Sequence, residues 1–326
     1  EETVQKEQGI IGQEIRMVED TPDWRVYTNL MESLYHSSPA RVAIAGTVES
    51  IADITAETLG ISFDPTAALE LRMMGAMGYD ATTFGNHEYD YLQSGLIGML
   101  NAAADSGDPV PTIVNANYWP PKEGQEGYSE AMWDALANYG MKKYTILERG
   151  GVYYVLFGIF GFDADDCAPN SGMAMEDPIE TAKAAVAAGV AECEAEYGVH
   201  PVVVCLSHSG TGGGKGEDYE LAEAVEGIDV IVSGHTHTTL REPITVNGTL
   251  IVSAAEYGRY LGVLKLKKSG NGVTLKSYEL IPIDENVAED PAIAATVEGF
   301  KADVEADYLS RYGYTFDQVL VSNPYT

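Results

Sequence analysis

Three short histidine-bearing segments hold the residues of this chain that could do chemistry. They are Gly85-Asn86-His87-Glu88-Tyr89-Asp90, Ser207-His208-Ser209-Gly210 and Gly234-His235-Thr236-His237, and together they contain four of the six histidines. Imidazole nitrogens and amide or carboxylate oxygens are the ligands that borderline divalent metals take in proteins. The three segments therefore predict a metal centre.

Each segment follows a stretch that is predicted to be a core element. A short strand over 81–84 precedes the first, an apolar strand over 201–206 the second, and a buried strand over 229–233 the third. Each segment is thus a loop at the end of an element, where a rigid scaffold can present side chains.

The rest of the chain predicts a mixed α/β fold. Strands that alternate with helices up to residue 233 indicate βαβ units, and consecutive strands follow after Thr238. We expect a two-sheet α/β sandwich with helices outside, preceded by a mainly helical N-terminal segment. Helices are predicted over 4–20, 23–36, 67–77, 94–104, 178–197, 217–225 and 291–308, and further strands over 41–45, 111–116, 144–148, 152–160, 244–246, 249–253, 261–266 and 273–280.

From about Ala67 onward, over roughly four fifths of the chain, the sequence resembles the calcineurin-like metallophosphoesterases. The likeness is to the catalytic domain of the bacterial 5′-nucleotidase family. It implies that Asn86, His208 and His235 bind one metal, and that His237 binds a second. It also implies that a catalytic His–Asp pair falls on His87 and Asp90.

The opening motifs of that family are missing. The family begins with a strand ending in Asp-x-His and a second ending in Gly-Asp, whose Asp bridges both metals. This chain has no Asp-x-His, and no Gly-Asp lies upstream of Asn86. Asp64 is a candidate substitute for the bridging carboxylate, although Asp-Pro is also an ordinary turn signal. The sandwich would then lack its usual first strands.

The missing carboxylates limit what the remaining ligands can hold. Four neutral ligands cannot offset two dications, whereas Asn86, His208 and His235 with water could hold one. The resemblance implies Mn, Zn, Fe, Mg or Ca ions as cofactors. Two functions stay open: a metal-dependent phosphoesterase with an incomplete dinuclear site, acting on nucleotides or related esters, and a non-catalytic remnant that binds one metal or none.

The N-terminal residues resemble a different family. Glu7 to Met17, Asp23 to Tyr27 and Ile44 to Ile51 are similar to an interior stretch of the pitrilysin-like inverted zinc peptidases. Glu14 would be the downstream zinc ligand, but the His-x-x-Glu-His motif is absent. We interpret the chain as a fusion of a peptidase-like fragment over 1–58 with a phosphoesterase-like domain over 59–326. Peptidase chemistry would need a second chain.

Composition restricts the partners. The net charge of −31 disfavours nucleic acid and anionic membrane surfaces, and a hydrophobic content of 45% is ordinary for a globular protein. We expect a small phosphate ester or nucleotide as ligand. No signal peptide or membrane span is visible, although the family resemblance implies an extracellular, cell-surface or periplasmic protein.

Two lesser features leave alternatives. Asn115 could contact substrate or cap the end of a strand. A bridge between Cys167 and Cys193 is possible, while Cys205 lies in an apolar strand and is expected to be a buried thiol.

Overall fold

A computed structural model describes residues 68–212 and 215–319. The predicted helices over 4–20 and 23–36, the strand over 41–45, and the candidates Glu14 and Asp64 lie outside these residues. The described residues form two compact units, one ending at Val304 and one beginning at Glu305, and each is described by itself. No helix in the described ranges is long and apolar enough to cross a membrane.

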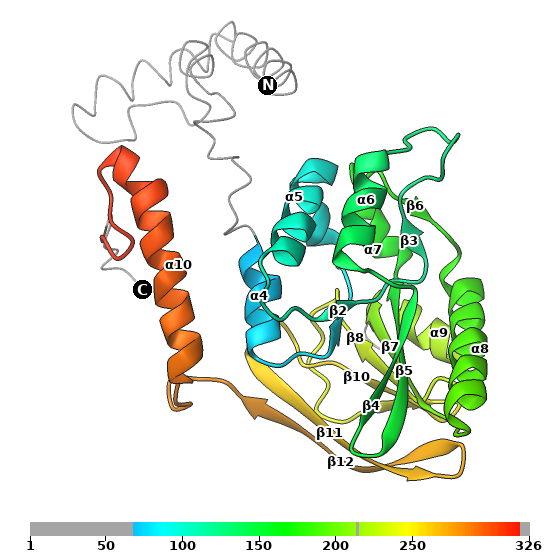
Figure 1. The fold of residues 1–326 in the computed structure, drawn as a ribbon. Coiled ribbons are helices and arrows are strands. Elements are labelled where there is room, and N and C mark those ends of the chain that lie inside the picture. Colours follow the sequence, from blue (N-terminus) through cyan, green and yellow to red (C-terminus); the bar gives the residue numbers. More distant parts are fainter. Residues whose placement is uncertain (1–67, 213–214, 320–326) are drawn as a thin grey trace, which may run out of the picture. The chain divides into compact units, whose positions relative to one another are not determined.

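A six-stranded mixed sheet forms the centre of the larger unit (Figure 1). Its four inner strands are parallel, and the two edge strands are antiparallel to their neighbours. The inner strands therefore all end at one edge of the sheet, where loops that follow them can meet. In spatial order the strands are β4 (Tyr144–Arg149), β5 (Val152–Phe160), β7 (Val202–His208), β8 (Val230–Ser233), β10 (Thr249–Val252) and β9 (Ile244–Val246).

Two helices cover one face of this sheet, α8 (Pro178–Tyr197) and α9 (Glu217–Ala224) (Figure 1). Both ends of α8 carry residues that favour helix termini: the Asp177 side chain accepts from the backbone N–H of Glu180, and Gly198 ends the helix in a left-handed conformation. Apolar side chains of α8 and α9 pack with those of the sheet in one buried cluster. Cys205 lies in this cluster, as predicted.

The opposite face of the sheet is less well covered. Val204 and Leu206 of β7 are half-buried, and Val232 of β8 is 43% exposed. Side chains that alternate with these along the same strands are fully buried against α8 and α9.

A second hydrophobic cluster joins three helices to short strands. The helices are α4 (Leu69–Ala76), α5 (Leu92–Asp105) and α6 (Glu130–Tyr139), and the strands are β2 (Thr112–Ile113), β3 (Tyr118–Trp119) and β6 (Ala174–Met175). A further short strand, β1 (Ala81–Thr82), pairs with β2. β1 and β2 are parallel, whereas β3 and β6 are antiparallel. The Tyr118 ring stacks on Phe160 at 4.2 Å between centroids, and Tyr89 contacts both rings edge-on. These contacts hold the second cluster on the end of β5.

The C-terminal elements follow the predicted order. β11 (Tyr260–Ser269) and β12 (Gly272–Pro282) form a long antiparallel hairpin. Helix α10 (Pro291–Asp307) follows, and then the 3₁₀ helix η4 (Leu309–Tyr312).

The mixed α/β class is therefore confirmed, with corrections in detail. The sequence interpretation did not anticipate α6, the short helix α7 (Phe162–Asp166), β3 or β6. A bridge between Cys167 and Cys193 was wrong, because all three cysteines are free. Cys167 is exposed after α7, while Cys193 is buried inside α8.

Asn117 ties the second cluster to the sheet. Its amide oxygen accepts from the backbone N–H of Phe160, and its amide nitrogen donates to the carbonyls of Phe160 and Glu176. Replacing Asn117 with Ala should lower the free energy of unfolding by about 1–3 kcal/mol, because buried groups lose their partners. Urea unfolding would measure this loss.

Asn138→Ala is a matched control. Asn138 is exposed and its amide bonds other exposed side chains, so its loss should change the free energy of unfolding by less than about 0.5 kcal/mol. Equal losses for the two variants would contradict a structural role for Asn117.

Candidate metal centre

The first histidine loop is shaped by a buried carboxylate and a buried ring. The chain leaves β1 and enters the 3₁₀ helix η3 (Asn86–Tyr89) at Gly85. The Glu88 carboxylate accepts from the backbone N–H of Gly85, and burial raises the pKa of Glu88. Tyr89 is anchored in the second cluster. Asn86 is thereby held nearly buried at the start of the turn.

The Asn86 amide oxygen is the point at which the three loops meet. It lies 2.8 Å from Nε2 of His208 and 3.2 Å from Nδ1 of His235. The ring centroids of the two histidines are 4.9 Å apart. One oxygen and two nitrogens therefore converge from three loops that are distant in sequence, and a single cation could take all three as ligands.

The His208 ring, at the end of β7, packs tightly against Gly85. A Cβ at Gly85 would lie 2.5 Å from Cε1 of the His208 ring, so a glycine is required there for close approach. The backbone N–H of Gly161 donates to the His208 carbonyl. Burial, followed by the nearby His235, lowers the pKa of His208 to about 4. His208 is therefore neutral at ordinary pH, which is the form that binds a metal.

The third loop is tied to the second by backbone and hydroxyl contacts. The Gly234 N–H donates to the Ser207 carbonyl, and the Thr211 N–H donates to the Thr236 hydroxyl. The Thr211 hydroxyl in turn donates to that of Thr238 at 2.7 Å. These bonds fix the position of His235 relative to His208.

His237 does not follow the geometry expected from its spacing. An extended segment would place His235 and His237 on the same side, but both have positive φ, 66° and 52°. The His237 ring is exposed and lies 5.7 Å from the Tyr257 ring, between centroids. Its charge is among the causes that lower the pKa of His208, so it borders the centre without joining the Asn86 cluster.

His87 and Asp90 form the pair that their spacing predicts. Nδ1 of His87 lies 2.9 Å from the Asp90 carboxylate, and both side chains are more than half exposed. The charge of His87 also lowers the pKa of His208. The pair is therefore close to the cluster and open to solvent.

Asn115 caps the end of a strand. It is fully buried, and its amide oxygen accepts from the backbone N–H groups of Asn117 and Tyr118. Its amide nitrogen has no hydrogen-bond partner within the described ranges. The hydrogen bonds of Asn115 therefore support its role in capping the strand. Its contact with substrate stays a prediction.

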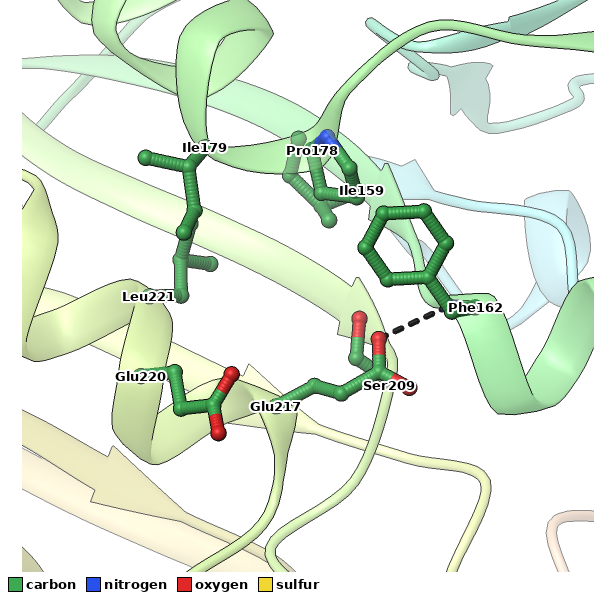
Figure 2. A pocket seen from close by; sticks show the side chains of 8 residues that line it. All are labelled: Ile159, Phe162, Pro178, Ile179, Ser209, Glu217, Glu220 and Leu221. Atoms are coloured by element: carbon green, nitrogen blue, oxygen red, sulfur yellow. Dashed lines mark hydrogen bonds between the residues drawn. The ribbon is translucent and has the colours of Figure 1, made fainter.

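The start of α7 is held by a second carboxylate. Glu217 accepts from the backbone N–H groups of Phe162 and Asp163, at 2.7 and 2.9 Å. Figure 2 shows Glu217 at the edge of a small apolar hollow, reaching toward Phe162. Asp163 therefore projects from a backbone that is anchored to the start of α9.

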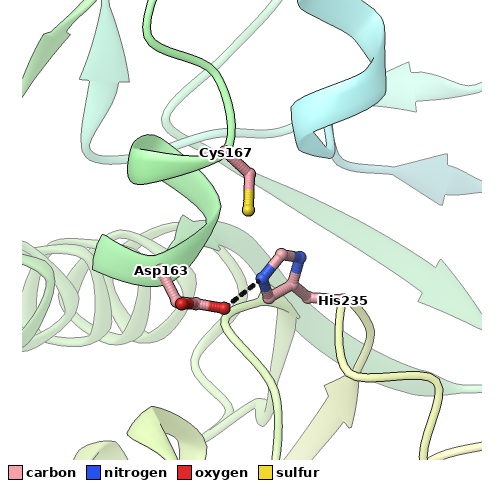
Figure 3. Close-up of side chains that lie close together, drawn as sticks. All are labelled: Asp163, Cys167 and His235. Atoms are coloured by element: carbon pink, nitrogen blue, oxygen red, sulfur yellow. Dashed lines mark hydrogen bonds and ion pairs between the residues drawn. The ribbon is translucent and has the colours of Figure 1, made fainter.

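Asp163 and Cys167 also reach the metal centre, and the sequence interpretation missed both in that role. The Asp163 carboxylate lies 2.8 Å from Nε2 of His235, on the other side of the ring from Asn86. Figure 3 shows the Cys167 sulfur turned toward the same ring. Ligand atoms of the three residues lie within 4.8 Å of one another. Their spacing of four residues after a buried strand was a signal that could have found them.

Comparisons with known proteins agree with this architecture, although no family model matches the chain. The trifunctional nucleotide phosphoesterase protein YfkN of Bacillus subtilis is 32% identical over 267 residues, which is 76% of this chain and 18% of that protein. A crystal structure of the calcineurin-like phosphoesterase YfkN aligns with a TM-score of 0.54 at 24% identity, covering 76% of each chain.

A second solved structure is the 5′-nucleotidase precursor of Thermus thermophilus. It aligns with a TM-score of 0.58 at 26% identity, and the match covers 75% of this chain and 46% of that one. The two structures confirm the metallophosphoesterase type of α/β fold predicted from the sequence.

A separate likeness concerns a short stretch. The uncharacterized zinc protease YmfH of Bacillus subtilis is 58% identical over 59 residues, 18% of this chain and 14% of that protein. This confirms the peptidase resemblance. The chain spans less than a fifth of the length of both curated Bacillus relatives.

The close contact between Gly85 and the His208 ring provides a test of whether His208 binds the metal. Gly85→Ala should displace the His208 ring and weaken binding of Mn²⁺ by about 10- to 100-fold, the range seen when the support of a ligand is lost. Isothermal titration calorimetry of Mn²⁺ would measure the change.

Gly299→Ala is the matched control, because a Cβ there meets nothing within 4 Å. It should bind Mn²⁺ as the unaltered chain does. If Gly85→Ala binds equally well, His208 is not a ligand held by this contact.

Proposed function

We propose that this chain, whose homologues and structural neighbours are calcineurin-like phosphoesterases and 5′-nucleotidases, hydrolyses phosphate monoesters with one divalent cation. Asn86, His208 and His235 would hold the cation. The observation that carries the proposal is the convergence of two imidazole nitrogens on the Asn86 oxygen, at 2.8 and 3.2 Å.

The donor set suits a single cation in an open site. A bound dication neutralises phosphate oxygens and lowers the pKa of bound water. The chain itself contributes one amide and two neutral rings, and its net charge of −31 repels phosphate at long range. Neutral ligands leave the full charge of the cation available to an anionic ester.

His87 is suited to proton transfer at the leaving group. With Nδ1 donating to Asp90, Nε2 can face the substrate, and the carboxylate stabilises the ring when it is protonated. The ring is 77% exposed, so a substrate can reach it. Asp90 acts by orienting His87 rather than by touching the ester.

Nucleotides are the substrate class that the relatives favour. The names of YfkN and of the Thermus protein specify nucleotide phosphoesterase and 5′-nucleotidase activity. The chain spans less than half of each of these two proteins, so the proposal extends to the phosphate ester and not to the choice of base.

The proposed organisation keeps the fusion described above. Residues 1–58 would be the peptidase-like fragment, and 59–326 the phosphoesterase-like domain. His237 and Asp64 remain the candidates for binding and bridging a second cation.

One observation favours a second candidate, a non-catalytic remnant. His237 contacts Tyr257 and stands apart from the Asn86 cluster, so a second cation lacks an assembled ligand set in the described ranges. Such a remnant would bind one metal and turn over nothing.

An aryl phosphate assay with Mn²⁺ distinguishes the two. Turnover should disappear with EDTA, and His87→Ala should lower kcat by about 10²- to 10⁴-fold, the usual contribution of general acid–base catalysis. Binding of Mn²⁺ should persist in that variant, because His87 is not among the converging donors.

His200→Ala is the control. His200 pairs with Glu194 at the opposite end of β7 from His208, and its loss should leave kcat unchanged. Full activity in His87→Ala would refute the proton-transfer role, and no turnover with any divalent metal would favour the remnant.

A further inference from the structure

We propose that Asp163, Cys167 and Nε2 of His235 form a second cation site, for a soft or borderline divalent ion such as Zn²⁺. Their ligand atoms lie within 4.8 Å of one another, and no other such group of three occurs in the described ranges (Figure 3). The site goes beyond the proposed phosphoesterase function, and only its effect on turnover rests on that function.

The carboxylate and the thiol of the site come from one turn of helix. Asp163 and Cys167 are four residues apart, and the Cys167 N–H donates to the Asp163 carbonyl, so both side chains leave the same face. The helix is anchored at its start by Glu217. His235 is fixed on the opposing loop, where only 10% of its side chain is exposed.

The geometry allows closure around an ion. Zinc bonds of 2.0–2.3 Å in a tetrahedron place ligand atoms about 3.5 Å apart. The Asp163 carboxylate and Nε2 of His235, now 2.8 Å apart, must separate slightly around the ion, and any ligand atoms nearer the 4.8 Å limit must draw closer. Asp163 and Cys167 are exposed and can rotate to do this, whereas His235 is held in place. Water would complete the coordination.

The chemistry of the donors differs from that of the Asn86 cluster. A carboxylate and a thiolate together neutralise a dication, and the thiol proton passes to solvent when the metal binds. Thiolate sulfur selects zinc-like ions over Mg²⁺ or Mn²⁺, which prefer oxygen. The new site therefore favours softer ions through its sulfur, a ligand that the Asn86 cluster lacks.

The two sites compete for one ring. A neutral imidazole has a single free lone pair. It lies on Nδ1, beside Asn86, when Nε2 carries the proton, and on Nε2, beside Asp163, when Nδ1 carries it. A metal at one nitrogen therefore withdraws His235 from the other. Zn²⁺ at the thiolate site should inhibit turnover that Mn²⁺ supports.

Cobalt provides a direct probe, because Co²⁺ bound to thiolate absorbs in the near ultraviolet. The chain has three cysteines, and Cys193 and Cys205 are buried, so the band would report on Cys167. We expect a band that saturates at one equivalent of Co²⁺, is lost in Cys167→Ser, and needs about tenfold more Co²⁺ or more in Asp163→Asn. Asp166→Asn, an exposed neighbour, should match the unaltered chain.

A second measurement guards against misfolded variants. In the unaltered chain, Zn²⁺ should slow alkylation of Cys167 by iodoacetamide, followed by mass spectrometry, and Asp163→Asn should reduce this protection. No thiolate band, or a band that persists in Cys167→Ser, would overturn the site. Turnover is measured separately, and Zn²⁺ should inhibit the Mn²⁺-supported reaction less in Cys167→Ser than in the unaltered chain. If neither the unaltered chain nor any variant turns over substrate, the phosphoesterase proposal is refuted. The Co²⁺ band tests the thiolate site in either case.

Discussion

A single amide oxygen organises the functional end of this fold. Asn86 can approach two imidazoles only because Gly85 has no side chain and because Tyr89 and Glu88 pin the turn from within. His208 and His235 are brought to it by neighbouring parallel strands, whose register pairs Ser207 with Ser233. Because these parallel strands end at the same edge of the sheet, the loops that follow them lie close together. Hydrogen bonds between the loops then fix the positions of the two histidines.

Much of this could be predicted from the sequence because the signals are local. Asp177, Pro178 and Gly198 mark the ends of α8, and apolar runs mark the buried strands. Helix α6 was missed although its signals are local as well: Ser129 caps it, Gly140 ends it, and its buried residues Met132, Ala135 and Leu136 recur with helical spacing. Helix α7 has a single turn, too short for any periodic pattern.

The orientation of side chains at the centre could not be predicted in the same way. The backbone is left-handed at both His235 and His237, so the same-side geometry of an extended segment with a spacing of two does not apply there. The contact of His235 with Asp163 joins a loop to helix α7, between residues that are 72 positions apart in the sequence. Cys167 was considered only as a disulfide partner, since nothing local indicates which ring its sulfur faces.

The charge of the converging ligands determines how many cations the centre can hold. The converging donors are neutral, so they suit one cation, and the Asp163 carboxylate lies across the His235 ring. Crystals soaked in Mn²⁺ and measured for anomalous scattering test this most directly. One peak is expected, bonded to Asn86 Oδ1, His208 Nε2 and His235 Nδ1; a peak that excludes Asn86, or none at these atoms, would contradict a centre organised by Asn86.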